Sequence, residues 1–406
     1  MQFPFLKTKA KQTIWTFALV SYLNDFGADM VHSLWPVFLT QTLGLNMALL
    51  GLIDGLGDAM ISISQAVSGY VSDRIQRRKI FIWVGYLLSA VSRFGFAIAQ
   101  GFPMALSSKL VERAGKMRDT PRDAIAAEVS DGHDRGGNFG ILRTMDSFGA
   151  VCGVLVSIWL IKFLPVRTIF VYAAIPSIIG AILVLTVIRE EHNGTTLYEG
   201  FHWKNLSGSF RWFLVLSALF SIASFSYSFL LIFAQKFGFT LFEIPVLYLI
   251  YMAGAMVSSY PLGHLADLLG RRIVILMGFL FWAATLSILL LSQGPIAIVF
   301  AFLLFGFSKG AIETVQRTFV TELAPHNYVA SALGTFKLVV GLSALPASLI
   351  AGLLWDQVGM FAPLHLSLIL TVVASVMLVF VDGRPQTTAL VPTSEQPLAI
   401  VPPVSE

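Results

Sequence analysis

Long apolar segments, separated by short polar connections, run through most of the chain. Each is at least as long as the roughly 20 residues that a helix needs to cross a membrane. The pattern predicts twelve membrane-spanning helices, at residues 14–42, 48–71, 80–100, 103–128, 137–163, 168–188, 211–235, 245–266, 273–292, 296–322, 330–355 and 362–381. We therefore expect an all-α polytopic membrane protein.

The predicted helices fall into two sets of six. Residues 189–210 are polar and contain three glycines, so we expect a cytoplasmic interdomain loop there. This loop separates an N-terminal six-helix bundle (14–188) from a C-terminal one (211–381). Residues 1–13 are expected to form a cytoplasmic N-terminal tail, and the proline-containing residues 382–406 a disordered cytoplasmic tail.

The two halves repeat each other at an offset of 194 residues. The sequence Gly-Tyr-Val-Ser-Asp at 69–73 aligns with Gly-His-Leu-Ala-Asp at 263–267. The same offset pairs residues of similar type, namely Asp119 with Glu313, Glu128 with Glu322, Gly140 with Gly334 and Arg143 with Lys337. One offset shared by several helices indicates a duplication. Two six-helix pseudo-repeats around a central pathway are typical of transporters.

Composition and charge support a membrane protein. The chain is 56% hydrophobic and 12% charged, about half the charged fraction of a soluble protein. Fourteen basic residues fall at one set of helix ends and three at the other. Since basic residues concentrate on the cytoplasmic side, both termini are expected in the cytoplasm. The exposed basic residues lie in short loops between spans, so the net charge of +4 does not indicate nucleic-acid binding.

Residues 109–128 concentrate charge inside a predicted span. Nine of these twenty residues are charged, and a charge at mid-bilayer costs about 2.5–3.5 kcal/mol on insertion scales. The segment must therefore face a bundle interior, a cavity or an interface, and Pro121 is expected to interrupt it. Glu112 and Lys116 are spaced to bridge within the helix. We predict a structural charge network with the next helix, formed by Glu112, Lys116, Arg122, Asp123, Arg143 and Asp146. The predicted substrate contacts are Arg113, Asp119, Glu313 and Arg317.

The first two predicted helices also carry acids. Asp25, Asp29 and His32 are spaced to share one helix face. They are candidates for proton coupling or cation binding, and the alternative is structural pairing with bases of the fourth and fifth helices. Asp54 and Asp58 repeat the spacing on the second helix, where either a pathway role or exposure to water is open. Phe225, Tyr227 and Phe229 are candidates for an aromatic pocket.

The loops at 69–79 and 263–272 resemble the signature between helices 2 and 3 of the major facilitator superfamily and its second-half copy. Gln76 stands where the first copy often has glycine. The resemblance implies a cytoplasmic gate made by Gly69, Asp73, Arg74, Arg77, Arg78, Gly263, Asp267, Arg271 and Arg272, with Glu128 and Glu322 as partners of the arginines.

Further motifs resemble a bacterial subgroup that includes drug-efflux and iron-linked magnetosome permeases. They are the segments Asp25–Pro36, Gly115–Ala124, Arg143–Asp146, Leu345–Ser348 and Gly352–Asp356. Gly140, Gly149 and Gly153 resemble the antiporter motif of helix 5, with Val154 where that motif has proline. Close helix packing is the alternative explanation of these glycines.

These features predict a secondary active transporter of the bacterial inner membrane, proton-coupled and monomeric, with export as one direction that the resemblance implies. The first alternative is an iron, divalent-metal or metal-chelate permease with Asp25, Asp29 and His32 as ligands. The second is a receptor or sensor on a transporter fold, which an attached soluble domain would support. The sequence contains no P-loop, so neither an enzyme nor a cofactor is expected.

Overall fold

The computed structural model describes residues 9–75, 77–130, 135–188, 208–323 and 329–381. These residues form helices and short connections, with no strand among them. In chain order the elements are α1 (Lys9–His32), α2 (Trp35–Val37), the π-helical turn η1 (Phe38–Thr42), α3 (Met47–Ile75), α4 (Arg78–Ile98), α5 (Phe102–Ala114), the 3₁₀ turn η2 (Gly115–Arg118), α6 (Asp119–Glu128), α7 (Arg135–Leu160), α8 (Val166–Val187), α9 (Gly208–Ala223), α10 (Tyr227–Lys236), α11 (Ile244–Leu269), α12 (Arg271–Leu291), α13 (Pro295–Leu323), α14 (Val329–Gln357) and α15 (Ala362–Val379).

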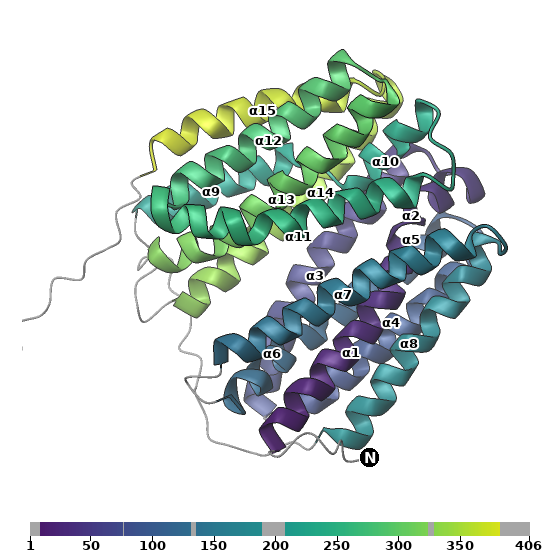
Figure 1. The fold of residues 1–406 in the computed structure, drawn as a ribbon, viewed down its shortest axis with the longest axis vertical. Coiled ribbons are helices and arrows are strands. Elements are labelled where there is room, and N and C mark those ends of the chain that lie inside the picture. The colour runs from purple at the N-terminus through teal and green to yellow at the C-terminus, as the bar shows by residue number, and fades with distance from the viewer. Residues whose placement is uncertain (1–8, 76, 131–134, 189–207, 324–328, 382–406) are drawn as a thin grey trace, which may run out of the picture.

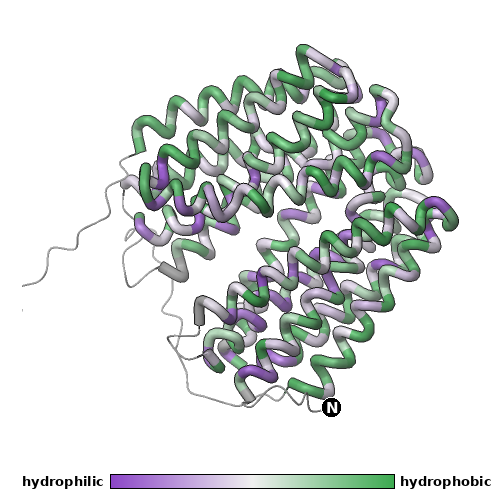
Figure 2. The backbone as a smooth tube through the Cα atoms, viewed as in Figure 1, coloured by the Kyte–Doolittle hydropathy of each residue, from purple (hydrophilic) through white to green (hydrophobic). Residues whose placement is uncertain are grey.

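Ten helical segments in the described residues are long and apolar enough to cross a membrane, with α9 and α10 counted as one segment. The other two predicted spans are α1 and the segment α5–η2–α6. Both carry charged residues within the span, which lowers their hydropathy. Hydrophobic residues cover most of the other helices, and hydrophilic residues are frequent within the N-terminal bundle (Figure 2).

The helices form two bundles, α1–α8 and α9–α15 (Figure 1). α1 begins at Lys9, inside the predicted tail, and α9 begins at Gly208, inside the predicted interdomain loop. Residues 189–207 of that loop and the whole tail 382–406 lie outside the described residues. The duplication is visible in the packing. A methyl group added at Gly69 would lie 2.9 Å from Thr120, and one at Gly263 would lie 3.3 Å from Thr314, the residue 194 positions later.

The first span of each half is broken near one end. In the first half α1 stops at His32, and α2 begins at Trp35. Pro36 has no backbone N–H, so the carbonyl of His32 loses its partner within the helix. The hydroxyl of Tyr227, at the start of α10 in the other half, donates to this carbonyl at 3.3 Å. The two breaks therefore contact each other across the bundles.

Small residues let the bundles approach closely along α3 and α14. Gly51 and Gly55 of α3 pack against the backbone of Ser348 and Leu345. At the end of this contact, the carboxylate of Asp356 accepts hydrogen bonds from the backbone N–H groups of Met47 (3.2 Å) and Ala48 (2.8 Å). We call the end of the molecule that holds Met47, Tyr227 and Asp356 the closed end. The bundles lie farther apart toward the opposite end, near α6 (Figure 1).

The glycines of α7 separate into two kinds. A side chain at Gly149 or Gly153 would overlap the backbone carbonyl of Tyr22 or Phe26 in α1, whereas one at Gly140 would meet no atom of the described chain within 4 Å. Close packing therefore explains two of the three glycines of the predicted antiporter motif.

We expect Gly153→Ala to reduce stability by about 1–3 kcal/mol, because the added methyl group must push α7 away from α1. Gly140→Ala is the matched control and should melt like the wild type or slightly higher, since alanine favours helix. Thermal melting of both variants in detergent measures the difference. Equal melting temperatures would show that α1 and α7 adjust without cost.

Candidate functional site

The charged segment 109–128 folds as two helices joined by the tight turn η2. At this turn Gly115 lies against α4, where an added methyl group would be 2.7 Å from the carbonyl oxygen of Gly85. Pro121 lies in the first turn of α6, where its missing N–H has no cost. Because Pro121 cannot donate to the carbonyl of Met117, an unbroken α-helix is disfavoured here. The predicted interruption is confirmed, but it precedes Pro121.

Glu112 lies at the centre of a buried cluster. Its Oε1 is 2.7 Å from Nε2 of His32, and its Oε2 is 3.0 Å from Nζ of Lys109. Lys109 is fully buried, and its Nζ lies 4.7 Å from the centre of the Trp35 ring. The predicted bridge from Glu112 to Lys116 is wrong, because the turn η2 moves Lys116 away toward Asp25.

Arg113 extends from the same helix toward the other bundle. Its guanidinium is 3.8 Å from Glu112 and 4.0 Å from Asp58 of α3. The Asp58 side chain is 41% exposed and is close enough to Lys309 of α13 to interact electrostatically. The pair Arg113–Asp58 thus lies on the face of the N-terminal bundle that looks toward the C-terminal bundle.

Two buried carboxylates are hydrogen-bonded across the bundles. Asp29 accepts a hydrogen bond from the hydroxyl of Tyr248 at 2.8 Å. Asp54 accepts three, from Nε1 of Trp35 (3.1 Å) and from the hydroxyls of Ser226 (2.7 Å) and Ser228 (2.5 Å). Tyr248, Ser226 and Ser228 all belong to the second half. Protonation or movement at either acid therefore acts directly on the contact between the bundles.

Asp25 and Asp29 are one turn apart but meet different groups. Asp25 accepts a hydrogen bond from Asn24 at 2.9 Å and lies 3.9 Å from Lys116 and 4.0 Å from Arg118. His32 is 3.6 Å from Asp29. Among the described residues, no group of three or more His, Cys, Asp or Glu side chains is arranged to hold a metal ion. Asp25, Asp29 and His32, the ligands predicted for the metal-permease alternative, therefore do not form such a group in this conformer.

A polar cavity of about 200 Å³ opens beside Asp25, between α1, α4, α6 and α7. We call it the α1–α7 cavity. Every lining residue has a polar or charged side chain, and the set is Ser21, Asn24, Asp25, Tyr86, Lys116, Arg118, Asp119, Arg122, Arg143, Asp146 and Ser147. It contains two predicted pathway residues, Asp25 and Asp119, and four residues of the predicted structural network.

The predicted charge network is divided by the structure. Arg122 forms a tight pair with Asp123, with contacts of 2.9 and 3.1 Å, and donates to Ser21 at 2.6 Å. Arg143 is more loosely placed, 3.6 Å from Asp123 and 3.5 Å from Asp146, with its side chain 57% exposed. Glu112 belongs to the separate cluster of Lys109 and His32.

The second half contributes a sparser set of charges. Glu313 and Arg317 are exposed on α13, and neither forms an ion pair within 4.0 Å with another described residue. Lys337 of α14 interacts electrostatically with Arg317 and, across the bundles, with Asp119 and Asp123. Phe225 and Phe229 are buried in the core of the C-terminal bundle beside Trp282 and Trp355. Tyr227 lies at the interface between the bundles, where its hydroxyl donates to the carbonyl of His32. The ring of Phe229 also reaches the other bundle, since a methyl group added at Gly51 of α3 would lie 3.1 Å from it.

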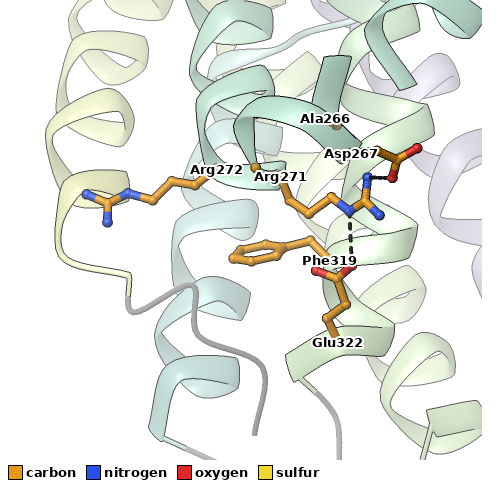
Figure 3. A pocket seen from close by; sticks show the side chains of 7 residues that line it. Ala266, Asp267, Arg271, Arg272, Phe319 and Glu322 are labelled. Atoms are coloured by element: carbon orange, nitrogen blue, oxygen red, sulfur yellow. Dashed lines mark hydrogen bonds and ion pairs between the residues drawn. The ribbon is translucent and has the colours of Figure 1, made fainter. Parts of the chain in front are cut away.

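The predicted partners of the loop arginines are confirmed. Arg271 at the start of α12 contacts Asp267 at 2.5 Å and Glu322 of α13 at 3.0 Å, beside a cavity of about 260 Å³ (Figure 3). Arg272 also lines this cavity, but the end of its side chain extends toward the end of α15, where it donates to the carbonyls of Val379 and Val381 (Figure 3).

In the first half Arg78 pairs with Glu128. The equivalent pair in the second half uses Arg271 rather than Arg272, so the repeat is shifted by one residue here. Arg74 donates to the hydroxyl of Tyr70 at 3.4 Å, and Arg77 is exposed just before α4. Asp73 lies in α3, and its side chain is outside the described set. The pairs Arg78–Glu128 and Arg271–Glu322 each join two helices of the same bundle. A role of these residues in gating stays a prediction.

Sequence reasoning missed Arg93 of α4. This side chain is 1% exposed and donates to the carbonyls of Ala173 and Asn24 (2.8 Å each) and to the hydroxyl of Ser177. It therefore ties α1, α4 and α8 together through neutral acceptors. The available signal was a lone arginine in the middle of an apolar span, which is rarely placed there without a role.

The fold and the charged interior define a multi-pass membrane transporter made of two repeated bundles. The model of the Major Facilitator Superfamily matches residues 17–249 and 211–405. The chain therefore belongs to the major facilitator superfamily.

Similar proteins agree with this assignment. The "Uncharacterized MFS-type transporter MJ1317" of Methanocaldococcus jannaschii is 31% identical over 385 residues, 91% of this chain and 95% of that protein. The multidrug resistance protein MdtH of Aeromonas hydrophila is 24% identical over 359 residues, 84% of this chain and 87% of that protein. A crystal structure of a mutant of the nucleoside transporter NupG is similar in fold, with a TM-score of 0.78 and 14% identity over 90% of this chain and 99% of that chain.

Proposed function

We propose that this chain is a proton-coupled secondary active transporter that moves a small solute by alternating access. The observation that carries the proposal is the hydrogen bond from Tyr248 to Asp29. Asp29 is a 9% exposed carboxylate in the first span, and its partner is a hydroxyl of the other bundle. The carboxylate of Asp29, the proton-binding group of this proposal, therefore also forms part of the contact between the bundles.

The coupling follows from hydrogen-bond energetics. A hydrogen bond to a charged group contributes about 1.5–3 kcal/mol, and one between neutral groups about 0.5–1.5 kcal/mol. Protonation of Asp29 therefore weakens the contact with Tyr248 by roughly 1 kcal/mol or more. About 1.4 kcal/mol changes an equilibrium tenfold. Proton binding at Asp29 can thus bias the closed end toward opening, which is what coupling requires.

The orientation of the chain in the membrane decides to which side this conformer is open. The basic loop residues favour a cytoplasmic location for the ends of α3 and α4 that hold Arg74, Arg77 and Arg78, and for both termini. The closed end then faces outward, and the conformer is open toward the cytoplasm. For a bacterial chain the membrane is the inner membrane. The name of MdtH, a multidrug resistance protein, favours export as the direction.

We expect Asp29→Asn to abolish accumulation driven by a pH gradient while leaving exchange of solute intact, because asparagine cannot bind and release the proton. The assay is flux in proteoliposomes, with a solute that stabilises the purified wild type. Asp356→Asn is the matched control, since it makes the same change at another acid that bridges the bundles but lies at a helix end. It should keep its dependence on the pH gradient.

A transporter with Asp29→Asn that still concentrates solute in response to the gradient would exclude Asp29 as the proton carrier. A wild type that binds solute without any flux would favour the receptor alternative. Tyr248→Phe removes the contact between the bundles but keeps the acid. Because protonation of Asp29 then has no bond with Tyr248 to weaken, we expect transport to lose most of its dependence on the pH gradient. Full dependence on the gradient in Tyr248→Phe would show that coupling does not pass through this bond.

A further inference from the structure

The charges of the α1–α7 cavity are close to one another but poorly paired. The shortest distance from Lys116 to Asp25 is 3.9 Å, from Arg118 to Asp119 3.7 Å, and from Arg143 to Asp146 3.5 Å. Charge-assisted N–H···O hydrogen bonds are about 2.7–2.9 Å long. Arg122 is satisfied by Asp123 and Ser21. Arg118 donates from Nη1 to Gly115 and Ser89, and Asp119 accepts a hydrogen bond from Gln65, but these neutral partners leave other polar atoms of the two side chains available. Three bases and three acids therefore surround the space with unused hydrogen-bonding capacity.

Among the residues that line the cavity, two buried side-chain atoms have no hydrogen-bond partner in the described structure. They are Nε of Arg118, whose residue is 2% exposed, and Oδ1 of Asp146. Orphaned buried donors and acceptors are rare, because each costs about 1–3 kcal/mol. Here one is a donor and the other an acceptor, and both belong to the lining of the same cavity. The site therefore offers both signs of charge to a ligand.

The charges of the lining residues limit the net charge that a ligand of this cavity can carry. Apart from the satisfied Arg122, the lining bases are Lys116, Arg118 and Arg143, and the lining acids are Asp25, Asp119 and Asp146. These six charges cancel. A ligand with a net charge would leave an uncompensated charge within the membrane, whereas a ligand that carries one positive and one negative group would not.

The small volume and polar lining of the cavity exclude a lipophilic cation as its ligand. Drug-sized ligands occupy pockets of about 300–1,000 Å³ with mostly apolar linings, and this cavity measures about 200 Å³ with an entirely polar lining. The lining contains one aromatic ring, that of Tyr86, and the guanidinium of Arg118 already covers it at 4.8 Å. No free aromatic face of the lining is left to attract a bulky cation.

We propose that the α1–α7 cavity is the substrate site and that the substrate is a small zwitterion of amino-acid size. Its carboxylate meets Lys116 and Arg143, and its ammonium meets Asp146 and Asp25. The inference rests on the proposed transport function and names the substrate class for it. It moves Lys116, Arg143 and Asp146 from the predicted structural network to the binding site.

The first test is a thermal-shift panel on the purified protein in detergent. The probes are the natural amino acids, one at a time, with succinate as a dianion and tetraphenylphosphonium as a lipophilic cation. We expect at least one amino acid to raise the melting temperature more than succinate or tetraphenylphosphonium does. A rise with tetraphenylphosphonium or succinate and with no amino acid would overturn the zwitterion, although the transport function would stand.

The second test locates the site by calorimetric titration of the amino acid that stabilises most. Lys116→Gln and Asp146→Asn should each weaken its binding about tenfold or more, because each loses a hydrogen bond to a charged group. Lys162→Gln, at an exposed position away from the cavity, should bind like the wild type. The matching amine without a carboxylate should bind weakly, and equally so to the wild type and to Lys116→Gln. A purely structural lysine would not produce that equality.

Wild-type affinity in both Lys116→Gln and Asp146→Asn would overturn the site. Unchanged melting temperatures of the ligand-free variants would show that lost binding is not lost folding. If the amino acid binds at this site but is not moved in proteoliposomes, the binding site stands and the proposed transport function fails.

Discussion

Glu112→Gln is expected to lower the stability of the protein by about 3–5 kcal/mol, the cost of removing one partner from a buried ion pair. The carboxylate of Glu112 lies between Nε2 of His32 and Nζ of Lys109, and Lys109 has no exposed surface. Glutamine keeps the shape but leaves the ammonium of Lys109 without the carboxylate that lies 3.0 Å from it. The Trp35 ring at 4.7 Å replaces only part of that interaction.

Glu128→Gln is the matched control, because it makes the same change in the same predicted span. Glu128 pairs with Arg78 at a helix end, and its side chain is 42% exposed. Exposed pairs contribute about 0–1 kcal/mol, so this variant should melt close to the wild type. The double variant Lys109→Met with Glu112→Gln should regain much of the stability, since it removes both charges. If Glu112→Gln melts like Glu128→Gln, then Lys109 does not depend on Glu112.

Asp54→Ala is expected to open the closed end of the molecule. Asp54 accepts hydrogen bonds from Ser226 and Ser228 of the other bundle at 2.7 and 2.5 Å. Two such bonds to a carboxylate contribute roughly 3 kcal/mol or more, and that loss would shift the open-to-closed ratio by about 100-fold. Spin labels at Thr42 and Phe242, exposed positions in opposite bundles, should report a longer distance.

Ser228→Ala provides a graded comparison, because it removes one of the two bonds between the bundles and keeps the acid. Its distance distribution should fall between those of the wild type and Asp54→Ala. A wild-type distribution in Asp54→Ala would mean that the packing of α3 against α14 holds this end without Asp54.

The fold could be predicted because the membrane limits the choices. A span of about 20 apolar residues has to be a helix, and the offset of 194 residues reports a duplication without any structure. The two most polar spans are helical as predicted, and the interruption predicted at Pro121 lies just before that residue, at η2. η2 depends on the contact of Gly115 with Gly85, which lies 30 positions earlier in the sequence. No local pattern contains that contact.

The residues of the candidate site could be predicted from the sequence, but the partner that each of them contacts could not. Helical spacing places Asp25 and Asp29 on one face, as expected, but one turn is a rise of about 5.4 Å. At that difference in height Asp25 meets Lys116 and Asp29 meets Tyr248. Which neighbour lies at each height depends on the packing of distant helices. For the same reason Arg93, Ser226 and Ser228 could not be assigned roles from sequence.

The hydrogen bonds from the start of α3 to Asp356 allow opening of the closed end to be followed by hydrogen–deuterium exchange. The first backbone N–H groups of a helix need an acceptor from outside it, and α3 receives its acceptor from the opposite bundle. When the bundles separate at that end, the amides of Met47 and Ala48 lose this protection. Their hydrogen–deuterium exchange is therefore a label-free record of how often the closed end opens, and it can be read from the unmodified protein.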